Sequence, residues 1–268
     1  MKHGFIENNE GISAESICGI LKSKEIKVCV LDSVDSTNNE ARRMAERGDE
    51  APALIIANSQ SAGRGRMGRS FYSPSQTGLY MSLLLGARAD MADNVRLTTA
   101  AAVAVCRSID EICGKASGIK WVNDVYLDGR KICGILCESF SVSAGGRFAV
   151  VGIGLNLHTE SFPKELADKA ASLFPEGDGR AVFAASITDK LYGFYREPDA
   201  ENIMEYYRGR SLVLGKKIIF TENGKAVEGF AEDVDDFGGL GVRLRDGSLR
   251  RLSGGEISLR LGDKGDIL

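Results

Sequence analysis

The sequence predicts an α+β fold, in which helices pack on a mixed or antiparallel sheet and a small C-terminal β-barrel follows. Two observations predict the larger part: strand-length apolar runs alternate with helical patterns, and a series of hairpin turns comes after them. The third observation is a change near Ser211, beyond which short strands are separated by glycine-containing turns. We therefore expect a leader over residues 1–26, a main domain over 27–210 and a barrel over 211–268.

The elements before the hairpins follow from apolar spacing and end signals. Ser13 is expected to cap a short amphipathic helix, and residues 1–10 are polar enough to be loose. The segment 35–38 supplies N-cap residues for a helix over 39–47, which Gly48 ends. The other expected elements here are strands over 27–31, 52–57 and 78–85 and a long helix over 93–113.

The middle of the chain predicts antiparallel hairpins. Asp128-Gly129 is a strong turn signal, and a second turn is expected over 143–146. The strands joined by these turns are 119–121, 125–127, 131–140 and 147–157. Residues 158–180 combine a helix fragment with a loop that contains glycine and proline, and helices follow over 181–195 and 200–210. This order favours a sheet with its helices on one face.

The composition is that of an ordinary globular protein, with 43% hydrophobic and 26% charged residues. A net charge of -3 argues against a general nucleic-acid-binding surface, so any recognition of anions must be local. Six cysteines without a Cys-x-x-Cys pair, together with two histidines, argue against a zinc site and favour reduced, buried thiols. No signal-peptide pattern or apolar stretch of membrane-spanning length occurs, which favours a cytoplasmic protein.

The most unusual stretch is the loop over residues 58–71, Asn-Ser-Gln-Ser-Ala-Gly-Arg-Gly-Arg-Met-Gly-Arg-Ser-Phe. Glycines allow tight turns and bring backbone N–H groups close to a ligand, and arginines are permanent cations whose forked donors suit carboxylate or phosphate. No Asp or Glu occurs from Ala51 to Ala89. The loop therefore predicts a site for an anion from outside the chain. Its members of these two kinds are Gly63, Gly65, Gly68, Arg64, Arg66 and Arg69.

Three other interpretations of this loop are a dinucleotide-binding fold, a Walker loop and a basic surface loop. Its glycines match G-x-G-x-x-G, but the residues that follow contain Pro74 and indicate a loop, where a dinucleotide-binding fold requires a helix. A Walker loop fails because no Gly-Lys is followed by Ser or Thr. The third interpretation is a solvated basic surface loop without a ligand.

Other segments carry polar groups that a small ligand needs. Ser36 and Thr37 either cap the helix or bind a polar ligand, and both interpretations stay open. Gln60 either lies on the surface or lines the same pocket as the basic loop. At the end of a strand, the run 151–156 offers two glycines and an amide, which permits the close approach of a flat base.

Charged residues gather around one hairpin, at 120–124 and 130–131. One interpretation is an ordinary charged surface with Trp121 in the core. In the other, a lysine acts as a point charge beside phosphate. Asp124 could then hold Mg²⁺, which takes one or two protein carboxylates plus phosphate oxygens, or accept a proton from an amine.

In this order and spacing, the motifs resemble those of biotin protein ligases over about residues 27–259. They are S-T-N at 36–38, Q-x-A-G-R-G-R-x-G-R at 60–69, K-W-x-N-D at 120–124, R-K-x-x-G-I-L-x-E at 130–138 and G-x-G-x-N at 152–156. The resemblance implies a class II synthetase-like catalytic domain with an SH3-like C-terminal barrel. It also implies a two-step reaction, in which biotin and ATP form biotinyl-adenylate and a carrier protein's lysine then takes the biotin.

The resemblance also assigns roles, residue by residue. The residues implied for biotin or its adenylate are Ser36, Thr37, Gln60, Gly63, Arg64, Arg66 and Lys131. Those implied for the nucleotide are Arg69 at phosphate, Phe71 stacking near adenine, Asn156 at the adenine edge, and Asn123, Gly152 and Gly154. Catalysis would fall to Lys131, which faces the carboxylate and α-phosphate, to Arg66, and to Asp124, which serves the acceptor lysine or the metal.

The implied cofactors are ATP and Mg²⁺, and the implied partner is the biotin carboxyl carrier protein of acetyl-CoA carboxylase or of a related carboxylase. We expect a monomer or weak homodimer that binds neither DNA nor membrane. The leader is too short for the DNA-binding domain of some members, so repressor activity is not expected. The chain departs from the family pattern at Val122, where the usual residue is proline.

Alternative functions lie in other classes. A lipoate-protein ligase would use the same adenylating chemistry on a different acid. A nucleic-acid-binding module would use the arginine loop and bind in a salt-sensitive manner. A non-catalytic biotin sensor would bind the vitamin without labelling a carrier.

Overall fold

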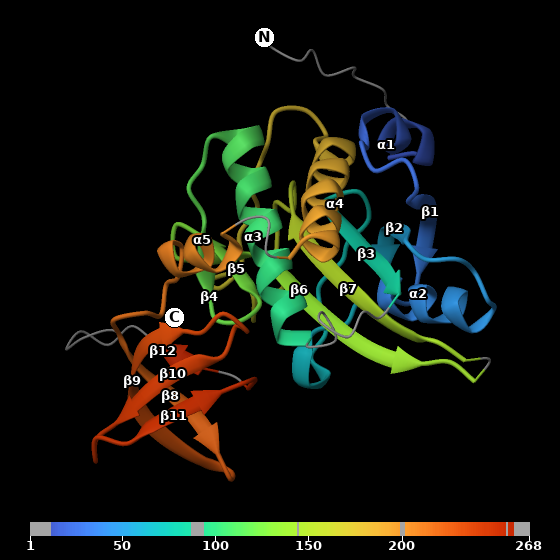
Figure 1. Ribbon diagram of the computed structural model, residues 1–268. Coiled ribbons are helices and arrows are strands. Elements are labelled where there is room, and N and C mark those ends of the chain that lie inside the picture. The colour runs from blue at the N-terminus through green and yellow to red at the C-terminus, as the bar shows by residue number, and fades with distance from the viewer. Residues whose placement is uncertain (1–11, 87–93, 144, 199–201, 256, 260–268) are drawn as a thin grey trace.

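The computed structural model describes the chain except for residues 1–11, 87–93, 144, 199–201, 256 and 260–268. Its larger part is built on a seven-stranded sheet in the order β1-β2-β3-β7-β6-β5-β4 (Figure 1). Only the β1–β2 pair is parallel, and the other five pairs are antiparallel, so the mixed sheet expected from the sequence is confirmed. The strands are β1 (Lys27–Val34), β2 (Ala53–Gln60), β3 (Gly78–Gly86), β4 (Gly118–Lys120), β5 (Asp124–Leu127), β6 (Arg130–Ser141) and β7 (Arg147–Asn156).

The described helices are α1 (Ala14–Ile20), α2 (Thr37–Glu46), α3 (Asn94–Cys113), α4 (Arg180–Arg196) and α5 (Ile203–Gly209). Ser13 caps α1 in a reciprocal capping box with Ser16, as its spacing predicts. The helix expected over 39–47 begins earlier, at Thr37, because Ser36 already has the extended backbone of an N-cap. The loose segment expected over residues 1–10 and the expected helix starts at Asp93 and Ala200 lie outside the described residues.

Two expectations about the helices are wrong. No helix fragment forms between 158 and 179, where Ala170 instead makes an isolated β-bridge with Lys131. The helices also do not share one face, because α2 packs on the side of the sheet opposite to α3 and α4. The reason lies in the central strands: Ala53 and Ile55 of β2 pack under α2, while Leu54 and Ile56 pack in the other core. An uninterrupted apolar run of this kind indicates a strand buried on both faces.

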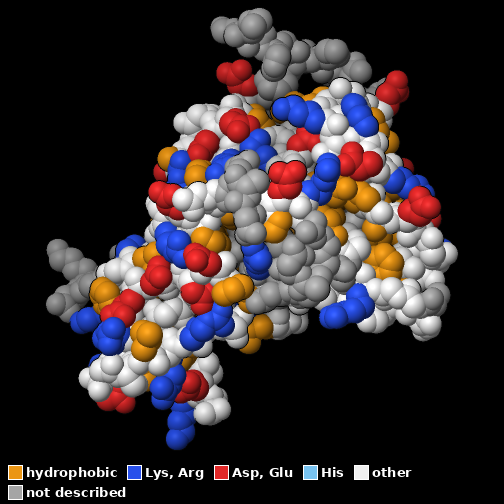
Figure 2. Space-filling view, viewed as in Figure 1, with side chains coloured by type: hydrophobic (Ala, Val, Ile, Leu, Met, Phe, Trp, Pro, Cys, Tyr) orange, Lys and Arg blue, Asp and Glu red, His pale blue; other side chains and the backbone are white. Residues whose placement is uncertain are grey.

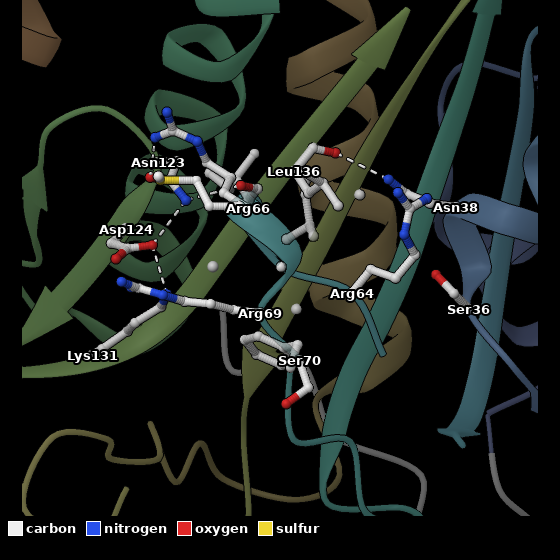
Figure 3. Close-up of a pocket in the computed structure, with 18 of the residues that line it drawn as sticks. Ser36, Asn38, Arg64, Arg66, Arg69, Ser70, Asn123, Asp124, Lys131 and Leu136 are labelled. Carbon is white, nitrogen blue, oxygen red and sulfur yellow. Dashed lines mark hydrogen bonds and ion pairs between the residues drawn. The ribbon is translucent and has the colours of Figure 1, made fainter. Parts of the chain in front are cut away.

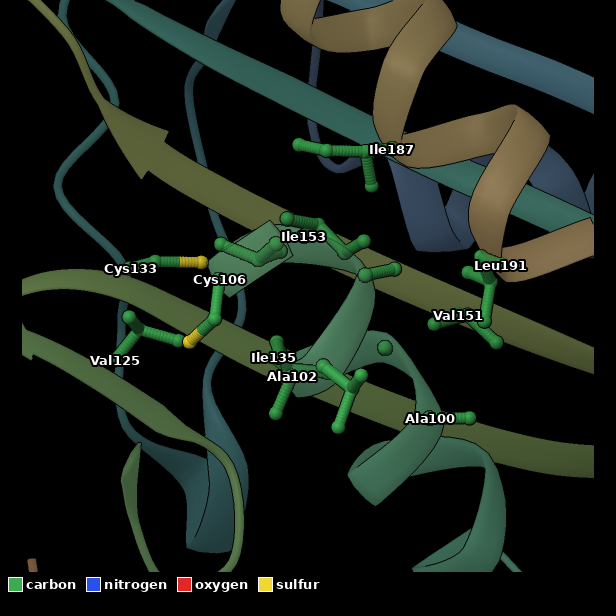
Figure 4. Packing of buried hydrophobic residues seen from close by; sticks show 14 of the residues in the cluster. Ala100, Ala102, Cys106, Val125, Cys133, Ile135, Val151, Ile153, Ile187 and Leu191 are labelled. Atoms are coloured by element: carbon green, nitrogen blue, oxygen red, sulfur yellow. The ribbon is translucent and has the colours of Figure 1, made fainter. Parts of the chain in front are cut away.

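The larger core lies between the sheet and the helices α3 and α4. Figure 4 shows Ala102 and Cys106 of α3 facing Cys133 and Ile135 of β6, with α4 packed beside β7. Small residues dominate the buried stretch 100–104 of α3, which lets the helix approach the sheet closely. The large core thus occupies one face and leaves the opposite face of β3, β7 and β6 for a site.

A second, five-stranded antiparallel sheet follows, in the order β11-β10-β9-β8-β12, as the barrel prediction requires. Its strands are β8 (Lys217–Glu222), β9 (Lys225–Val234), β10 (Leu240–Leu244), β11 (Leu249–Leu252) and β12 (Ile257–Leu259). The strands of the two sheets fall on either side of the boundary expected at Ser211. The division into separate domains stays a prediction.

Charges of both signs are mixed over the face seen in Figure 2, rather than gathered by sign. This pattern agrees with the small net charge of -3 and leaves local clusters as the places for anion recognition. Within the described part of the chain, no helix is long and apolar enough to cross a membrane.

Candidate functional site

A cavity lies on the α2 side of the sheet, between the start of α2, the basic loop and the strands β6 and β7. All but two of the site residues expected from the sequence line it. They are Ser36, Thr37, Gln60, Arg64, Arg66, Arg69, Phe71, Asn123, Asp124, Lys131, Gly152 and Gly154. Side chains that are far apart in the sequence are thus brought together by the order of the strands.

Three glycines form the floor of the cavity. Gly134 of β6 pairs with Gly154 of β7, and Gly152 lies two residues away on the same face. A Cβ atom on Gly152 would overlap with the side-chain amide of Asn38, and one on Gly154 would lie 2.6 Å from Cζ of Phe71. The glycines are therefore required by close packing, since their backbone angles are not in the left-handed region.

One end of the cavity is lined mainly by uncharged polar groups, and the charge of Arg64 at this end is paired with Glu138. The backbone N–H of Thr37 donates to Oε1 of Gln60 at 2.9 Å, and Nε2 of Gln60 donates to Oγ of Ser73 at 2.8 Å. Ser36 is the N-cap residue of α2, but its side chain makes no capping hydrogen bond. The Ser36 hydroxyl, which is buried, therefore lines the cavity rather than serving the helix. The Ser36 side chain therefore does not cap the helix, and its binding of a polar ligand stays a prediction.

The other end is charged. Nζ of Lys131 lies 2.6 Å from Oδ1 of Asp124, and Nδ2 of Asn123 donates to the same oxygen at 3.0 Å. Nη1 of Arg66 donates to Oδ1 of Asn123 at 2.8 Å. Figure 3 shows this group across the cavity from Ser36 and Asn38. With Arg69 and Lys120 also lining the cavity, the cations at this end outnumber the carboxylate of Asp124 among the lining residues that the structure describes.

The turn that presents Asn123 and Asp124 is held from three sides. Nδ2 of Asn123 donates to the carbonyl of Ile135 at 3.0 Å, and Nε1 of Trp121 donates to the carbonyl of Gly238, in the turn between β9 and β10, at 2.9 Å. Tyr207 donates to the carbonyl of Val122 at 3.2 Å, and burial raises the pKa of Tyr207 well above its usual value, so the phenol stays a donor. The Trp121–Val122 peptide bond is cis.

The aromatic side of the cavity is anchored in the same way. Phe71 meets Tyr80 edge-on, with ring centroids 6.4 Å apart. Tyr80 donates to the carbonyl of Pro74 at 2.9 Å, and burial raises the pKa of Tyr80 to about 12. The phenol is therefore protonated at all physiological pH values, and its hydrogen bond holds the segment that carries Phe71.

Arg64 does not point an unpaired charge into the cavity. Its guanidinium makes two hydrogen bonds to Glu138 of β6, at 2.8 and 2.9 Å, and a third to Oδ1 of Asn39 at 3.0 Å. The forked geometry matches a carboxylate. Arg64 thus fastens the basic loop to β6 and α2, in addition to any contact with a ligand.

We expect Glu138→Gln to loosen this loop, because the neutral amide removes the charge that Arg64 pairs with. Since the Arg64 side chain is 40% exposed, the stability loss should be at most about 1 kcal/mol. Limited trypsin digestion should nevertheless cut after Arg64, Arg66 or Arg69 several times faster. The control is Glu232→Gln, which breaks a similar paired contact with Arg243 in the second sheet. Equal cleavage rates at the loop in both variants would contradict the role of Glu138.

Two expected site residues lie outside the cavity. Gly63 is buried where a Cβ would meet Oγ of Ser73 at 2.7 Å, so it serves the packing of the loop. Asn156 is 5% exposed, and its Nδ2 donates to the carbonyl of Ala171 at 3.1 Å. The segment 169–171 also pairs with the backbone of Lys131. Lys131 N–H donates to the carbonyl of Lys169 at 2.8 Å, and Ala171 N–H donates to the carbonyl of Lys131 at 2.9 Å.

Several lining residues were not assigned roles from the sequence. Asn38 and Gly134 both line the cavity and both lie within the motifs quoted above. Membership of those motifs is the sequence feature by which they could have been found. Lys120 begins the K-W-x-N-D motif and also lines the cavity, over the ring of Tyr126. Ile135 and Leu136 carried no signal, because apolar residues in a strand are expected in any core.

A bound metal would depend on few protein ligands. No group of three or more His, Cys, Asp or Glu side chains that could hold a metal exists within the described ranges. Asp124 is the carboxylate at the cationic end, and the contacts with Lys131 and Asn123 both use its Oδ1. Oδ2 fits the single protein ligand that Mg²⁺ needs when phosphate oxygens supply most of its coordination shell.

Comparison with known proteins identifies the family. Residues 30–156 match the Biotin/lipoate A/B protein ligase family, and residues 213–260 match the Biotin protein ligase C terminal domain. The biotin--[acetyl-CoA-carboxylase] ligase of Paracoccus denitrificans is 32% identical over 227 residues, which cover 80% of this chain and 93% of the relative. The chain belongs to the biotin protein ligase family.

Other relatives of this ligase agree. The bifunctional ligase/repressor BirA of Bacillus spizizenii is 30% identical over 85% of the chain and 72% of its own length. Among solved structures, the biotin protein ligase of Aquifex aeolicus in complex with biotin and ATP has a TM-score of 0.71 at 25% identity, covering 87% of the chain and 98% of the neighbour. The class II synthetase-like fold with an SH3-like C-terminal part, expected from the resemblance, is thereby confirmed for the ligase.

Proposed function

We propose that this ligase joins biotin to ATP as biotinyl-adenylate and then transfers the biotin to a lysine of a carrier protein. The observation that supports this most directly is the polarity of the cavity, with a neutral, hydrogen-bonding end and a cationic end. Biotin has the same asymmetry, because a neutral ureido ring lies at one end and a carboxylate at the other. Charge matching supports a position of the carboxylate near Lys131 and Arg66 and of the ring near Thr37 and Gln60.

In the first step, a carboxylate oxygen attacks the α-phosphorus of ATP, the bond to the β-phosphate oxygen breaks, and pyrophosphate leaves. No base is needed, because the carboxylate is already the nucleophile. The protein must bring two anions together and offset the negative charge that develops at phosphorus. Lys131 contacts Asp124 and Arg66 contacts Asn123, so both cations lie at the same turn. From there they can hold the two anions together and offset the charge at phosphorus.

In the second step, the amine of the carrier's lysine attacks the acyl carbon of the mixed anhydride, AMP leaves with the electrons of the broken bond, and the amine loses a proton. Asp124 is the carboxylate at this end of the cavity, and we assign it to orient the amine and receive that proton. When Mg²⁺ is bound, it neutralises phosphate charge, and Asp124 would be its protein ligand.

The carrier is proposed from the relatives, since the Paracoccus denitrificans and Mycobacterium tuberculosis proteins are named biotin--[acetyl-CoA-carboxylase] ligases. We propose the biotin carboxyl carrier protein of such a carboxylase as the partner. Adenine contacts by Phe71 and Asn156, a monomeric or weakly dimeric state, a cytoplasmic location and the lack of DNA binding stay predictions.

Incubation with ATP, Mg²⁺, biotin and a biotin carboxyl carrier domain tests the proposal by intact-mass measurement. We expect one biotinyl group on the carrier, and biotin-dependent exchange of labelled pyrophosphate into ATP. Exchange with lipoate but not with biotin would assign the ligase to the lipoate branch of the matched family. Binding of biotin without exchange would leave only a sensor.

Arg66→Ala should release the adenylate prematurely. Nη1 of Arg66 donates to Oδ1 of Asn123 at 2.8 Å, and Nη2 donates to the carbonyl of Gly255, between β11 and β12, at 3.2 Å. Arg66 therefore links the basic loop to both segments. Without these bonds, the adenylate should dissociate on the order of tenfold to a hundredfold faster, as expected for the loss of charge-assisted hydrogen bonds. Stray biotinylation of a bystander protein, detected by streptavidin blotting, should rise accordingly. Arg243→Ala, in the second sheet, is the control, and equal leakage from both variants would refute this role.

A further inference from the structure

The turn between β4 and β5 leads into the charged end of the cavity. The two strands pair as far as Lys120 and Asp124, so the residues between them lie outside the register of the sheet. Val122, within this turn, is 3% exposed, and its carbonyl therefore needs a donor from inside the protein. In the described part of the chain, the hydroxyl of Tyr207 is that donor, at 3.2 Å. The position of the turn thus depends on a side chain of α5, 85 residues away.

Tyr207 can affect the site only through the backbone of this turn. Its side chain is fully buried and does not line the cavity. Burial raises the pKa of Tyr207 well above its usual value, so the phenol donates a hydrogen bond and keeps its proton. Because a peptide group is planar, holding the Val122 carbonyl also fixes the orientation of the N–H of Asn123. The direction in which the Asn123 side chain leaves the backbone is then set as well.

Arg208, the next residue of α5, holds the same turn by a second route. Its Nε donates to the carbonyl of Val234 at 2.6 Å, and its Nη2 donates to Oδ1 of Asp236 at 2.6 Å. Both partners lie where β9 turns toward β10, and the carbonyl of Gly238 in that turn accepts from Nε1 of Trp121 at 2.9 Å. A Cβ atom on Gly238 would lie 2.9 Å from two side chains of α3, so the β9–β10 turn is closely packed where it meets the main domain.

We propose that Tyr207 and Arg208, together the α5 pair, are positioning residues that align the turn before Asp124 for the transfer of biotin to the carrier's lysine. The inference rests on the proposed function, in which Asp124 orients the acceptor amine and receives its proton. Since Asp124 directly follows the turn, a shift of the turn moves its carboxylate. Lys131 depends less on the turn, because a separate segment pairs with its backbone N–H and carbonyl. The α5 pair therefore matters more for transfer than for adenylate formation.

The test measures the two steps separately on the full chain. Biotin-dependent pyrophosphate exchange reports adenylate formation. Transfer is followed by mixing the preformed protein-bound adenylate with a biotin carboxyl carrier domain, quenching, and measuring the intact mass of the carrier. Tyr207→Phe keeps the ring and removes the donor, and Arg208→Met keeps an apolar stem and removes the guanidinium.

We expect each of these variants to slow transfer by at least about tenfold, because a misplacement of about 1 Å at a reacting group can cost about 100-fold in rate. Exchange should change by less than about threefold. The affinity for biotin, measured by calorimetry, should also stay within about threefold of the wild type, since Thr37 and Gln60 are held by contacts that do not involve the turn.

Matched variants separate positioning from general stability. Tyr206→Phe removes the neighbouring phenol of α5, which donates to Oδ2 of Asp110 on α3 at 2.7 Å. Arg243→Met removes a guanidinium that is paired with Glu232 within the second sheet. Both controls should leave transfer and exchange unchanged. If the α5 pair were only structural, the transfer rates of all four variants would follow their stabilities in denaturant unfolding.

Equal losses in both steps, or unchanged transfer, in variants of the α5 pair that still bind biotin would overturn the inference. The two variants break different hydrogen bonds, so Arg208→Met, whose side chain is only 31% exposed in the wild type, decides the matter if Tyr207→Phe does not fold. A wild-type protein that forms no adenylate would instead overturn the proposed function.

Discussion

Lys131→Ala is expected to lower the rate of biotin-dependent pyrophosphate exchange by about 10²–10³-fold, the cost of removing one stabilising group from a charged transition state. The affinity for biotin should fall less than about tenfold, since Lys131 is held in place by Asp124 and by backbone pairing with residues 169–171 before any ligand binds. Exchange assays at saturating substrate, combined with calorimetry for biotin, separate the two effects. Equal losses in rate and affinity would make Lys131 a binding residue only.

The ion pair with Asp124 provides a stringent control for this prediction. Removing Lys131 leaves the Asp124 carboxylate in a cavity that must hold two anions, so part of the loss could come from repulsion. In the double variant Lys131→Ala with Asp124→Asn, that repulsion is gone. We expect recovery of no more than a few fold, and full recovery would mean that Lys131 only neutralises Asp124. Lys190→Ala, which breaks the ion pair with Glu111, should leave exchange unaffected.

Gly152→Ala is the second change with a large expected effect. The added Cβ would overlap with the Asn38 amide, whose Cγ would lie only 2.9 Å away. Asn38 is held by Leu136, Glu138 and Ser82, so it cannot move without breaking those bonds. Overpacking of this kind costs about 1–3 kcal/mol of unfolding free energy. Biotin affinity should fall at least tenfold, on the order of one lost buried hydrogen bond.

Gly193→Ala is the matched control for that variant. Gly193 lies within α4, and a Cβ there has nothing within 4 Å. Alanine in a helix is favoured over glycine by about 0.5–1 kcal/mol, so this variant should be slightly stabilised and bind biotin normally. Denaturant unfolding and calorimetry measure both quantities. If Gly152→Ala were as stable as Gly193→Ala and bound biotin equally well, Asn38 would not pack too closely against position 152 for a methyl group to fit.

The fold could be predicted where local signals are strong. The Asp128-Gly129 turn, the Ser13 cap and the helix within 93–113 each depend on neighbours in the sequence, and each forms. The distribution of helices over the two faces of the sheet could not be predicted this way. The apolar run at Ala53–Ala57 indicates burial on both sides, but nothing local says that α2 covers one side and α3 the other.

The residues of the site divide along the same line. By itself, the sequence determined which chemical groups are present: a cationic glycine loop, a Lys–Asp pair near a hairpin, and small hydroxyl and amide groups at a helix start. Only the tertiary structure decided which of them share a cavity, that Asn156 and Gly63 lie outside it, and that Arg64 is tied to Glu138. The physical reason is that hydrogen-bond partners here are far apart in the sequence. Ser82 and Asn38 are separated by 44 residues, and Arg64 and Glu138 by 74. Residue type sets what a group can donate or accept, but the pairing of distant strands sets the partner it meets.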